Sequence, residues 1–186
     1  MKKIITLFER DFKNNGKINT TPVSDPTGLV ATEKLDGTNV RLTVRNHTLV
    51  RVEKRRNPDN IQKAKGIIEP WYVDAYDCAD DKFIMEAAKN TDLSLVEDGE
   101  WSGEALGPSI QGNPLNLDKH QVFLFSVPEI RKSVVFENVP ITFDGLKEWL
   151  PLQKTKFGNN CGIEGIVWWN WKENDPITKI KVKDFK

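Results

Sequence analysis

A strict alternation of apolar and polar residues is the clearest local pattern in the chain. It runs through residues 40–45 and again through 48–53, with Asn46 and His47 between the two runs. A period of two is typical of half-buried strands, and the short polar interruption predicts a tight turn. We therefore expect a β-hairpin here, in which His47 is a turn residue and not a ligand.

The same reasoning predicts the remaining elements. Helical spacing of apolar residues occurs at 81–90 and at 144–150, where Asp144 would cap the helix and Pro151 would end it. No repeat or shift in composition marks a linker, so we expect one α+β domain, residues 1–186, built on antiparallel sheet. Short apolar runs bounded by Gly, Pro, Asn or Asp predict further strands at 28–33, 100–106, 121–127, 163–169 and 177–183.

The charge balance argues against a strongly basic nucleic-acid binder. The chain has 27 Lys and Arg against 27 Asp and Glu, so a polyanion would have to bind a local basic face. Cys78 and Cys161 are too few for a disulfide framework and lie in no zinc spacing, which predicts reduced thiols. No apolar run approaches the roughly 20 residues that span a bilayer. We expect a cytoplasmic protein, of cellular or phage origin, that does not bind membranes.

Lys34 belongs to a K-x-D-G element that follows the apolar residues Leu29 to Ala31. A lysine amine attacks phosphorus only when neutral, and because its ordinary pKa is about 10.4, its surroundings must lower that value. Asp36 and Gly37 indicate a turn, where glycine would let backbone approach a ribose or phosphate. Taken alone, the segment fits a simple hairpin turn with a solvated strand-end lysine better than a reactive site.

Two glutamates stand beside glycines in strand-like segments, Glu104 after Gly103 and Glu164 before Gly165. An ionised carboxylate in such a strand is costly unless a cation pairs with it. Two carboxylates in one cleft would suit Mg²⁺, whereas each alone would fit a structural Glu–Lys pair. Glu100 is a rival for the role of Glu104, because residues four apart in a strand share a face.

The segment 179–183 alternates lysines with apolar residues and predicts three lysines on one strand face. A solvent-facing edge strand is the simpler interpretation. Beside the other motifs, however, Lys181 and Lys183 would suit a grip on the α-phosphate and the leaving pyrophosphate. Phe123 and Phe125 share a face of one predicted strand, either as core residues or as a platform for a purine.

In their fixed order, these motifs resemble the covalent nucleotidyltransferase superfamily of ATP-dependent DNA ligases, RNA ligases and mRNA-capping guanylyltransferases. The sequence is most similar to phage-type ATP-dependent RNA ligases, over residues 28–184. The resemblance implies an adenylyltransferase domain, ATP-grasp-like in outline, with two antiparallel β-sheets, flanking helices and ATP between the sheets. The motifs that carry it are K-x-D-G at 34–37, Lys54-Arg55, Gly103-Glu104 with 107–111, Glu164-Gly165 and 180–183.

The resemblance also implies a role for each matching residue. Lys34 would become lysyl-AMP, and Lys181 and Lys183 would complete the catalytic set. The implied nucleotide-binding residues are Glu33 at the adenine, Lys34, Asp36, Gly37, Glu104 at the ribose, Phe125 stacked on the adenine, Glu164 as the metal-linked carboxylate, Lys181 and Lys183.

The resemblance also implies a second set of residues, which would contact a nucleic-acid end and which includes the basic run at 54–56. Two features depart from many relatives. Ser126 follows Phe125 where an aspartate is common, and only three residues follow Lys183, so no OB-fold domain is expected. The implied nucleic-acid contacts are Thr38, Asn39, Lys54, Arg55 and Arg56.

We therefore expect an ATP-dependent RNA ligase that uses Mg²⁺ or Mn²⁺ and seals 3′-OH and 5′-phosphate ends through lysyl-AMP. Its partners would be RNA ends, including a nicked duplex or an RNA–DNA hybrid. It would act as a monomer, alone or with a separate nucleic-acid-binding protein. A minimal ATP-dependent DNA ligase and a capping-type guanylyltransferase are the alternatives. A non-catalytic nucleotide or nucleic-acid binding module is a more distant one.

Overall fold

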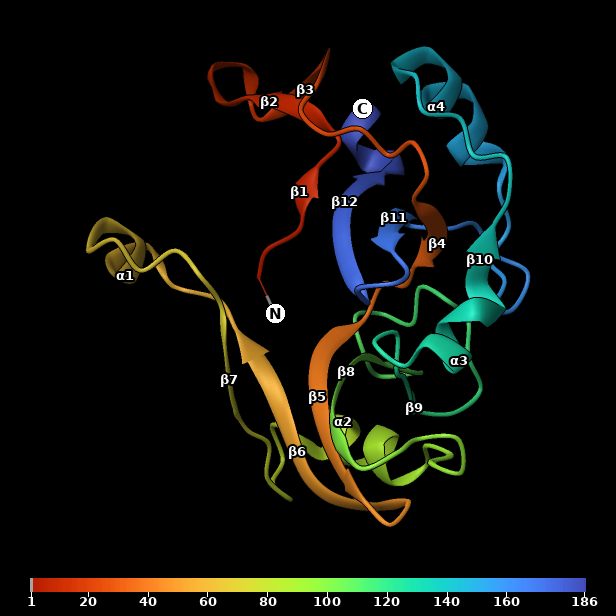
Figure 1. Cartoon of the computed structure of the whole chain (residues 1–186). Helices are drawn as coiled ribbons and strands as arrows, with labels where there is room; N and C mark the ends of the chain where they lie inside the picture. The colour runs from red at the N-terminus through yellow and green to blue at the C-terminus, as the bar shows by residue number, and fades with distance from the viewer. Residues whose placement is uncertain (1) are drawn as a thin grey trace. The chain divides into compact units, whose positions relative to one another are not determined.

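The computed structural model describes residues 2–186, which fold into two compact units (Figure 1). The first, here called the hairpin unit, comprises Asp36–Ile130 and the N-terminal residues up to Lys3. The second, the lysine unit, comprises Ile4–Leu35 and Arg131–Lys186. Neither is one continuous segment, which explains why no linker is visible in the sequence. That the two units form a single domain stays a prediction.

The hairpin unit contains a five-stranded antiparallel sheet in the order β7-β6-β5-β8-β9. Its centre is the predicted hairpin, and the turn at Asn46 and His47 is confirmed. Both turn residues have positive φ, 49° and 57°, as a two-residue turn between twisted strands requires. The strands are β5 (Thr38–Arg45), β6 (Thr48–Arg56), β7 (Trp71–Asp74), β8 (Gly99–Leu106) and β9 (Gln121–Phe123).

One face of this sheet packs on a helix. Val40, Leu42 and Val44 alternate along β5 and are fully buried, together with Ala87 and Ala88 of the helix. This helix, α2 (Lys82–Lys89), confirms the element expected at 81–90. The other helices that the hairpin unit contains or shares are short, α1 (Asn60–Ala64) and α3 (Pro128–Arg131).

The lysine unit has a five-stranded sheet in the order β1-β12-β11-β4-β10 and a separate ladder of β2 and β3. Its core includes Leu7, Leu146, Ile166, Trp168 and Ile180. The strands are β1 (Ile5–Thr6), β2 (Phe8–Asp11), β3 (Lys17–Pro22), β4 (Val30–Lys34), β10 (Val135–Phe136), β11 (Gly165–Asn170) and β12 (Asp175–Lys181). The helical segments are α4 (Phe143–Trp149) and 3-10 turns at Phe12–Asn14, Lys132–Val134, Leu150–Leu152 and Val182–Phe185.

The expected α+β class is confirmed in part. Several sheets and few helices are present, but β1 pairs with β12 in parallel, and the β2–β3 ladder forms a third sheet. The expectation of two purely antiparallel sheets was therefore incomplete. Within residues 2–186, no helix has the length and apolar character needed to cross a membrane.

The ends of several elements differ from the prediction. Helix α4 is capped by Thr142, whose Oγ1 accepts from the Gly145 amide, and not by Asp144. Pro151 does not end the helical path, because a 3-10 turn continues through it. The strand expected at 121–127 ends at Phe123, because the amide of Phe125 bonds back to the carbonyl of Phe123. Phe125 therefore lies in a turn and not on the strand.

Candidate active site

Strand register in the lysine unit brings two lysines together. The central strand β11 lies between β4 and β12, and its first residue, Gly165, is in register with both Lys34 and Lys181. Residues directly opposite in neighbouring strands point to the same face of a sheet. The two lysines, far apart in sequence, thus stand on one face, on either side of Gly165.

The carboxylate of Glu164 joins these two lysines. Lys34 Nζ lies 2.6 Å from Glu164 Oε2, and Lys181 Nζ lies 2.7 Å from Oε1. Burial acts to raise the pKa of Glu164, but the charges of Lys34 and Lys181 and their hydrogen bonds outweigh it, so the pKa lies below its usual value. Two amines therefore share one ionised carboxylate, and all three side chains are mostly shielded from solvent.

Gly165 is required by the close approach of two strands. A Cβ built on it would lie 2.0 Å from the carbonyl oxygen of Ile180 and 2.8 Å from the Cα of Lys181. The same is true of Gly37 and Gly103, whose added Cβ atoms would meet neighbouring strand backbone at 2.3 and 2.7 Å. The backbone of neighbouring strands therefore accounts for the absence of a side chain at these three positions.

A buried aspartate holds the end of β12. Asp184 Oδ2 accepts from the Lys181 amide at 2.8 Å, and Oδ1 pairs with Arg10 Nη2 at 2.6 Å. This closes the 3-10 turn and places Lys183 in the turn, exposed, and not on the strand face with Lys181. The expected single face of three lysines therefore ends at Lys181. Sequence reasoning missed both Asp184 and Arg10.

Glu33 is engaged inside the lysine unit. Its buried carboxylate accepts from Thr155 Oγ1 at 2.6 Å and from the Lys156 amide at 2.7 Å. Burial raises the pKa of Glu33, although these hydrogen bonds act to lower it. The side chain that was expected at the adenine thus anchors the segment at 155–158. Thr155 was not predicted, although a carboxylate in an apolar strand requires a partner.

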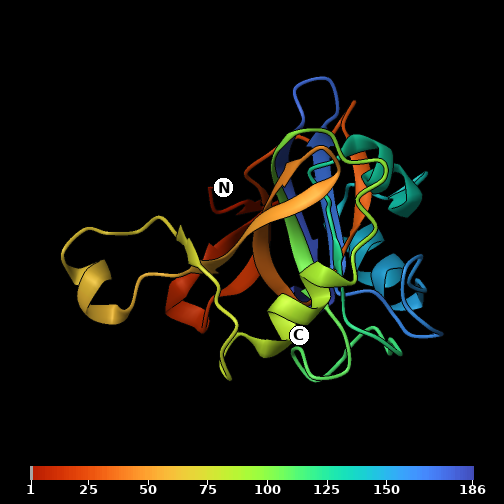
Figure 2. The ribbon, with the colours of Figure 1, turned by 90° about the horizontal axis from the view of Figure 1, so that it is seen from below.

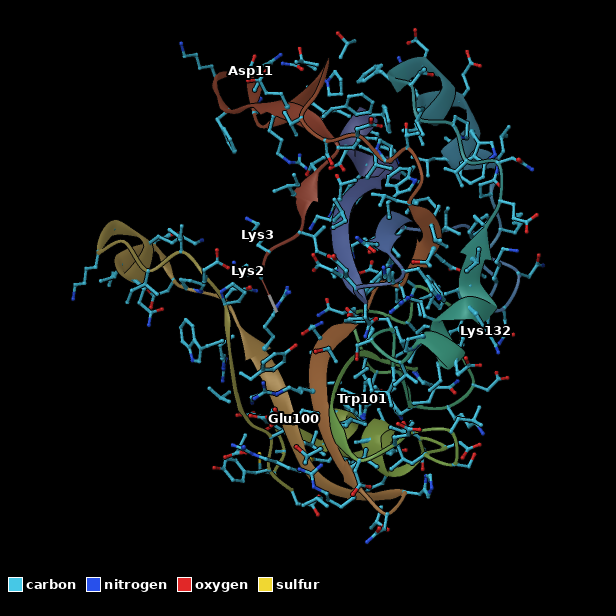
Figure 3. All side chains as sticks on the ribbon, in the orientation of Figure 1. Lys2, Lys3, Asp11, Glu100, Trp101 and Lys132 are labelled. Carbon is cyan, nitrogen blue, oxygen red and sulfur yellow. The ribbon has the colours of Figure 1, made fainter. Side chains whose placement is uncertain are left out.

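In the hairpin unit, Glu104 and not Glu100 lies against the K-x-D-G segment. The Gly37 amide donates to Glu104 Oε1 at 3.3 Å, and Glu104 is in register with Asn39. Glu100, labelled in Figure 3, belongs to the same strand, β8. Its side chain is half exposed, and its Oε2 lies 3.9 Å from Arg41 Nη1. Of the two glutamates, Glu104 is therefore the one that contacts Gly37.

The residues expected to bind nucleic acid also belong to the hairpin unit. Lys54 is paired with the buried Asp81 and is thereby used within the unit. Asn39 Oδ1 accepts from the hydroxyl of Tyr72 at 2.8 Å. Arg55 is half-buried and Arg56 exposed. Thr38 is half-buried, and its Oγ1 accepts a hydrogen bond from Gln111 Nε2 at 3.4 Å. Asp36 and Phe125, which were expected to bind the nucleotide, are half-buried in the same unit.

Residues 2–186 contain no group of three or more His, Cys, Asp or Glu side chains arranged to hold a metal ion. Glu164 is the carboxylate nearest to the two lysines. Mg²⁺ commonly takes one or two carboxylates and completes its shell with waters and substrate phosphates. The donor set here fits such a cation only with a phosphate-bearing substrate.

Neither a protein-family model nor a curated protein matches the sequence. Solved structures do show a likeness. The chain is similar to an apo mutant of an RNA ligase from Naegleria gruberi, with a TM-score of 0.40 and 18% identity over 84% of this chain and 50% of that one. A Naegleria gruberi RNA ligase mutant with AMP and Mn gives a TM-score of 0.40 and 17% identity, over 84% of this chain and 50% of that one. Another mutant of that ligase, with ATP and Mn, gives a TM-score of 0.40 and 16% identity, over 98% of this chain and 60% of that one. The chain thus spans 50% to 60% of the length of these ligases, and the likeness is distant.

Proposed function

We propose that this protein is an ATP-dependent RNA ligase that transfers AMP from ATP to Lys34 and then to the 5′-phosphate of an RNA end. The observation that carries the proposal is the bridge from Lys34 through Glu164 to Lys181, at the ends of β4 and β12 on either side of β11. A lysine beside a second cation and a carboxylate is the arrangement that a phosphate-attacking amine needs. The choice of ATP and RNA is supported by the motif resemblance.

In the first step, neutral Lys34 Nζ attacks the α-phosphorus of ATP. A nitrogen–phosphorus bond forms, the bond to the bridging oxygen breaks, and pyrophosphate leaves with that electron pair. The amine proton passes to solvent. Lys34 must leave Glu164 for this attack, and Lys181 would neutralise charge on the phosphates as it develops.

The substrate phosphates would also change the role of Glu164. Once Lys34 is released, the carboxylate of Glu164 would be free to hold Mg²⁺ or Mn²⁺ together with phosphate oxygens and water. The ion would supply further neutralisation of phosphate charge. AMP would then move from Lys34 to a 5′-phosphate, and a 3′-OH would displace AMP to seal the strand.

Labelling with nucleotide tests the first step directly. With α-labelled ATP and Mg²⁺ or Mn²⁺, we expect an adduct that survives denaturation and alkali but is released by acid, as a phosphoramidate is, and that mass spectrometry places on Lys34, with far less label from GTP. Lys34→Ala should abolish it, whereas Lys172→Ala, an exposed lysine of the same unit, should not. AMP on another residue, or no adduct on well-folded protein, would refute the covalent mechanism.

A further inference from the structure

A short helical arm extends from the sheet of the hairpin unit, and we propose that it binds the phosphate backbone of the nucleic-acid strand to be joined. We define the arm as residues 55–71, from the end of β6 through α1 to the start of β7. The inference rests on the proposed function and goes beyond it, because it assigns a binding surface to residues 57–71, outside the motifs. Its test is separate from the adenylylation test.

The arm is held by its own local bonds and not by the core. Helix α1 has no buried residue, and a capping box joins Asp59 and Gln62, with hydrogen bonds of 2.8 and 2.9 Å. Strands β6 and β7 pair up to Arg56 and Trp71, and the chain then leaves the sheet. Two views show α1 standing away from that sheet (Figure 1, Figure 2). The arm is therefore open to a partner over most of its length, although Pro58 is buried.

The positive charges of the arm lack the close carboxylate partners that three cations of the neighbouring sheet have, and Asp81, whose pKa the charge of Arg56 lowers, is itself paired with Lys54. On the sheet, Arg41 pairs with Glu53, Arg51 with Asp74 and Lys54 with Asp81. In the described chain, residues 2–186, no ion pair involves the four cations of the arm. They are Arg55, Arg56, Lys63 and Lys65.

The acidic residues of the arm do little to offset these four cations. Asp59 and Glu69 are the acidic residues between positions 55 and 71, and Asp59 is engaged in the cap. The chain as a whole has no net charge. A local positive excess on an exposed element is therefore the kind of surface that attracts a polyanion.

An aromatic side chain stands beside these cations. Trp71 is 37% exposed and is in register with Arg56. Cations that contact phosphates, together with an aromatic ring on which a base stacks, are the usual means of holding a single strand. Ile67 and Ile68 are also exposed and add apolar surface for a base or ribose.

The charges favour nucleic acid over a second copy of the chain. The exposed isoleucines alone would also suit a dimer. Such a dimer would bring four unpaired cations of one arm close to those of the other, which is unfavourable. A phosphate backbone neutralises these cations and leaves the apolar side chains in contact with bases.

The test compares Lys63→Ala/Lys65→Ala with a matched control, Lys82→Ala/Lys89→Ala, which removes two exposed lysines from helix α2. The probes are 5′-phosphorylated, fluorescent RNA and DNA single strands of one sequence, with anisotropy measured between roughly 50 and 200 mM salt. We expect the arm variant to weaken binding about tenfold at low salt. It should also flatten the plot of log K against log salt by about 1.4, since each phosphate contact on a single strand contributes about 0.7.

Trp71→Ala should weaken binding and leave that slope unchanged, because stacking releases no counterions. The control and the wild type should bind alike, and all variants should form lysyl-AMP at the wild-type rate. Equal losses on RNA and DNA support backbone recognition. Unchanged affinity and slope in both arm variants would overturn the proposal. So would a wild-type dimer in sedimentation that Ile68→Asp dissociates while nucleic-acid binding persists. If the wild type forms no lysyl-AMP, the proposed function fails, but these binding data still decide the role of the arm.

Discussion

The two units use similar charged residues in opposite ways. On the sheet of the hairpin unit, Arg41 and Arg51 face three carboxylates, because Glu53 pairs with both arginines, Asp74 pairs with Arg51 and Glu100 lies 3.9 Å from Arg41. In the lysine unit, two amines share the single carboxylate of Glu164. Matched charges hold strands together and leave little for a ligand. Two amines on one carboxylate leave a local excess of positive charge, which under the proposed function would be offset by the phosphates of the nucleotide.

The largest effect is expected from removing the shared charge. Glu164→Gln keeps the shape of the side chain but leaves both lysines without their counterion. We expect the rate of Lys34 adenylylation to fall by roughly 10²- to 10³-fold, as for the loss of one preorganised electrostatic partner. Glu173→Gln, at an exposed position of the same unit, is the control. A wild-type rate in Glu164→Gln would mean that the bridge is structural, like the pairs of the hairpin unit.

The next prediction concerns the backbone beneath the cluster. Gly165→Ala places a methyl group 2.0 Å from the Ile180 carbonyl oxygen, so β11 and β12 must separate, and Lys181 with them. We expect a loss of about 1–3 kcal/mol in the free energy of unfolding, measured by urea denaturation, as for overpacking. We also expect slower adenylylation.

Gly162→Ala is the matched control for this change. The nearest atom to its new Cβ would be 3.7 Å away, at the Gln153 carbonyl oxygen, which is ordinary contact. Its stability should therefore stay close to that of the wild type. If Gly165→Ala were equally well tolerated, the close register that places Lys34 and Lys181 together would not be needed.

A smaller effect is expected one layer away from the cluster. Asp184→Asn weakens the pair with Arg10 and the acceptor for the Lys181 amide. We expect stability to fall by about 1.5–3 kcal/mol, the range for a hydrogen bond to a charged group. Adenylylation should slow because Lys181 loses its support, and Asp184→Glu should restore part of it. Asp175→Asn, exposed on the same strand, should change neither. An unchanged rate in Asp184→Asn would limit Asp184 to a structural role.

The contrast between these residues shows what sequence can predict. Alternation correctly located the hairpin, and short bounded apolar runs located β4, β8, β9, β11 and β12. The motif order singled out Lys34, Glu164 and Lys181, which the fold brings together. Alternation also suggested that Lys183 continues the strand, but a side chain three residues beyond Lys181 ends it. The side chain that ends the strand is Asp184, and its partner Arg10 is 174 positions away in the sequence.

Other misses have the same physical origin. Thr155 lies 122 positions from Glu33, and a single sequence carries no signal for such a partner. The strands within residues 5–22 are short, exposed at many positions and paired at a sheet edge or in a two-stranded ladder. They therefore show no period of two. Glycines at 37, 103 and 165 were noticed, but only the three-dimensional register shows that strand backbone occupies the space beside them.

The smallest effect contrasts two glutamates of the lysine unit whose pKa values move in opposite directions. The pKa of Glu164 lies below its ordinary value of 4.5, because its two lysines outweigh the burial that would raise it. Its stabilising contribution is therefore present above pH 4.5 and is lost as the pH falls through the lowered value.

The pKa of Glu33 lies above 4.5, because burial outweighs the lowering effect of its hydrogen bonds. Its contribution is present below 4.5 and is lost as the pH rises through the raised value. Chemical denaturation from acid to neutral pH should show the stability advantage of the wild type over Glu164→Gln growing with pH, and that over Glu33→Gln shrinking. Slopes of the same sign would show that the shared carboxylate and the buried one respond to their surroundings alike, and the distinction between them would fail.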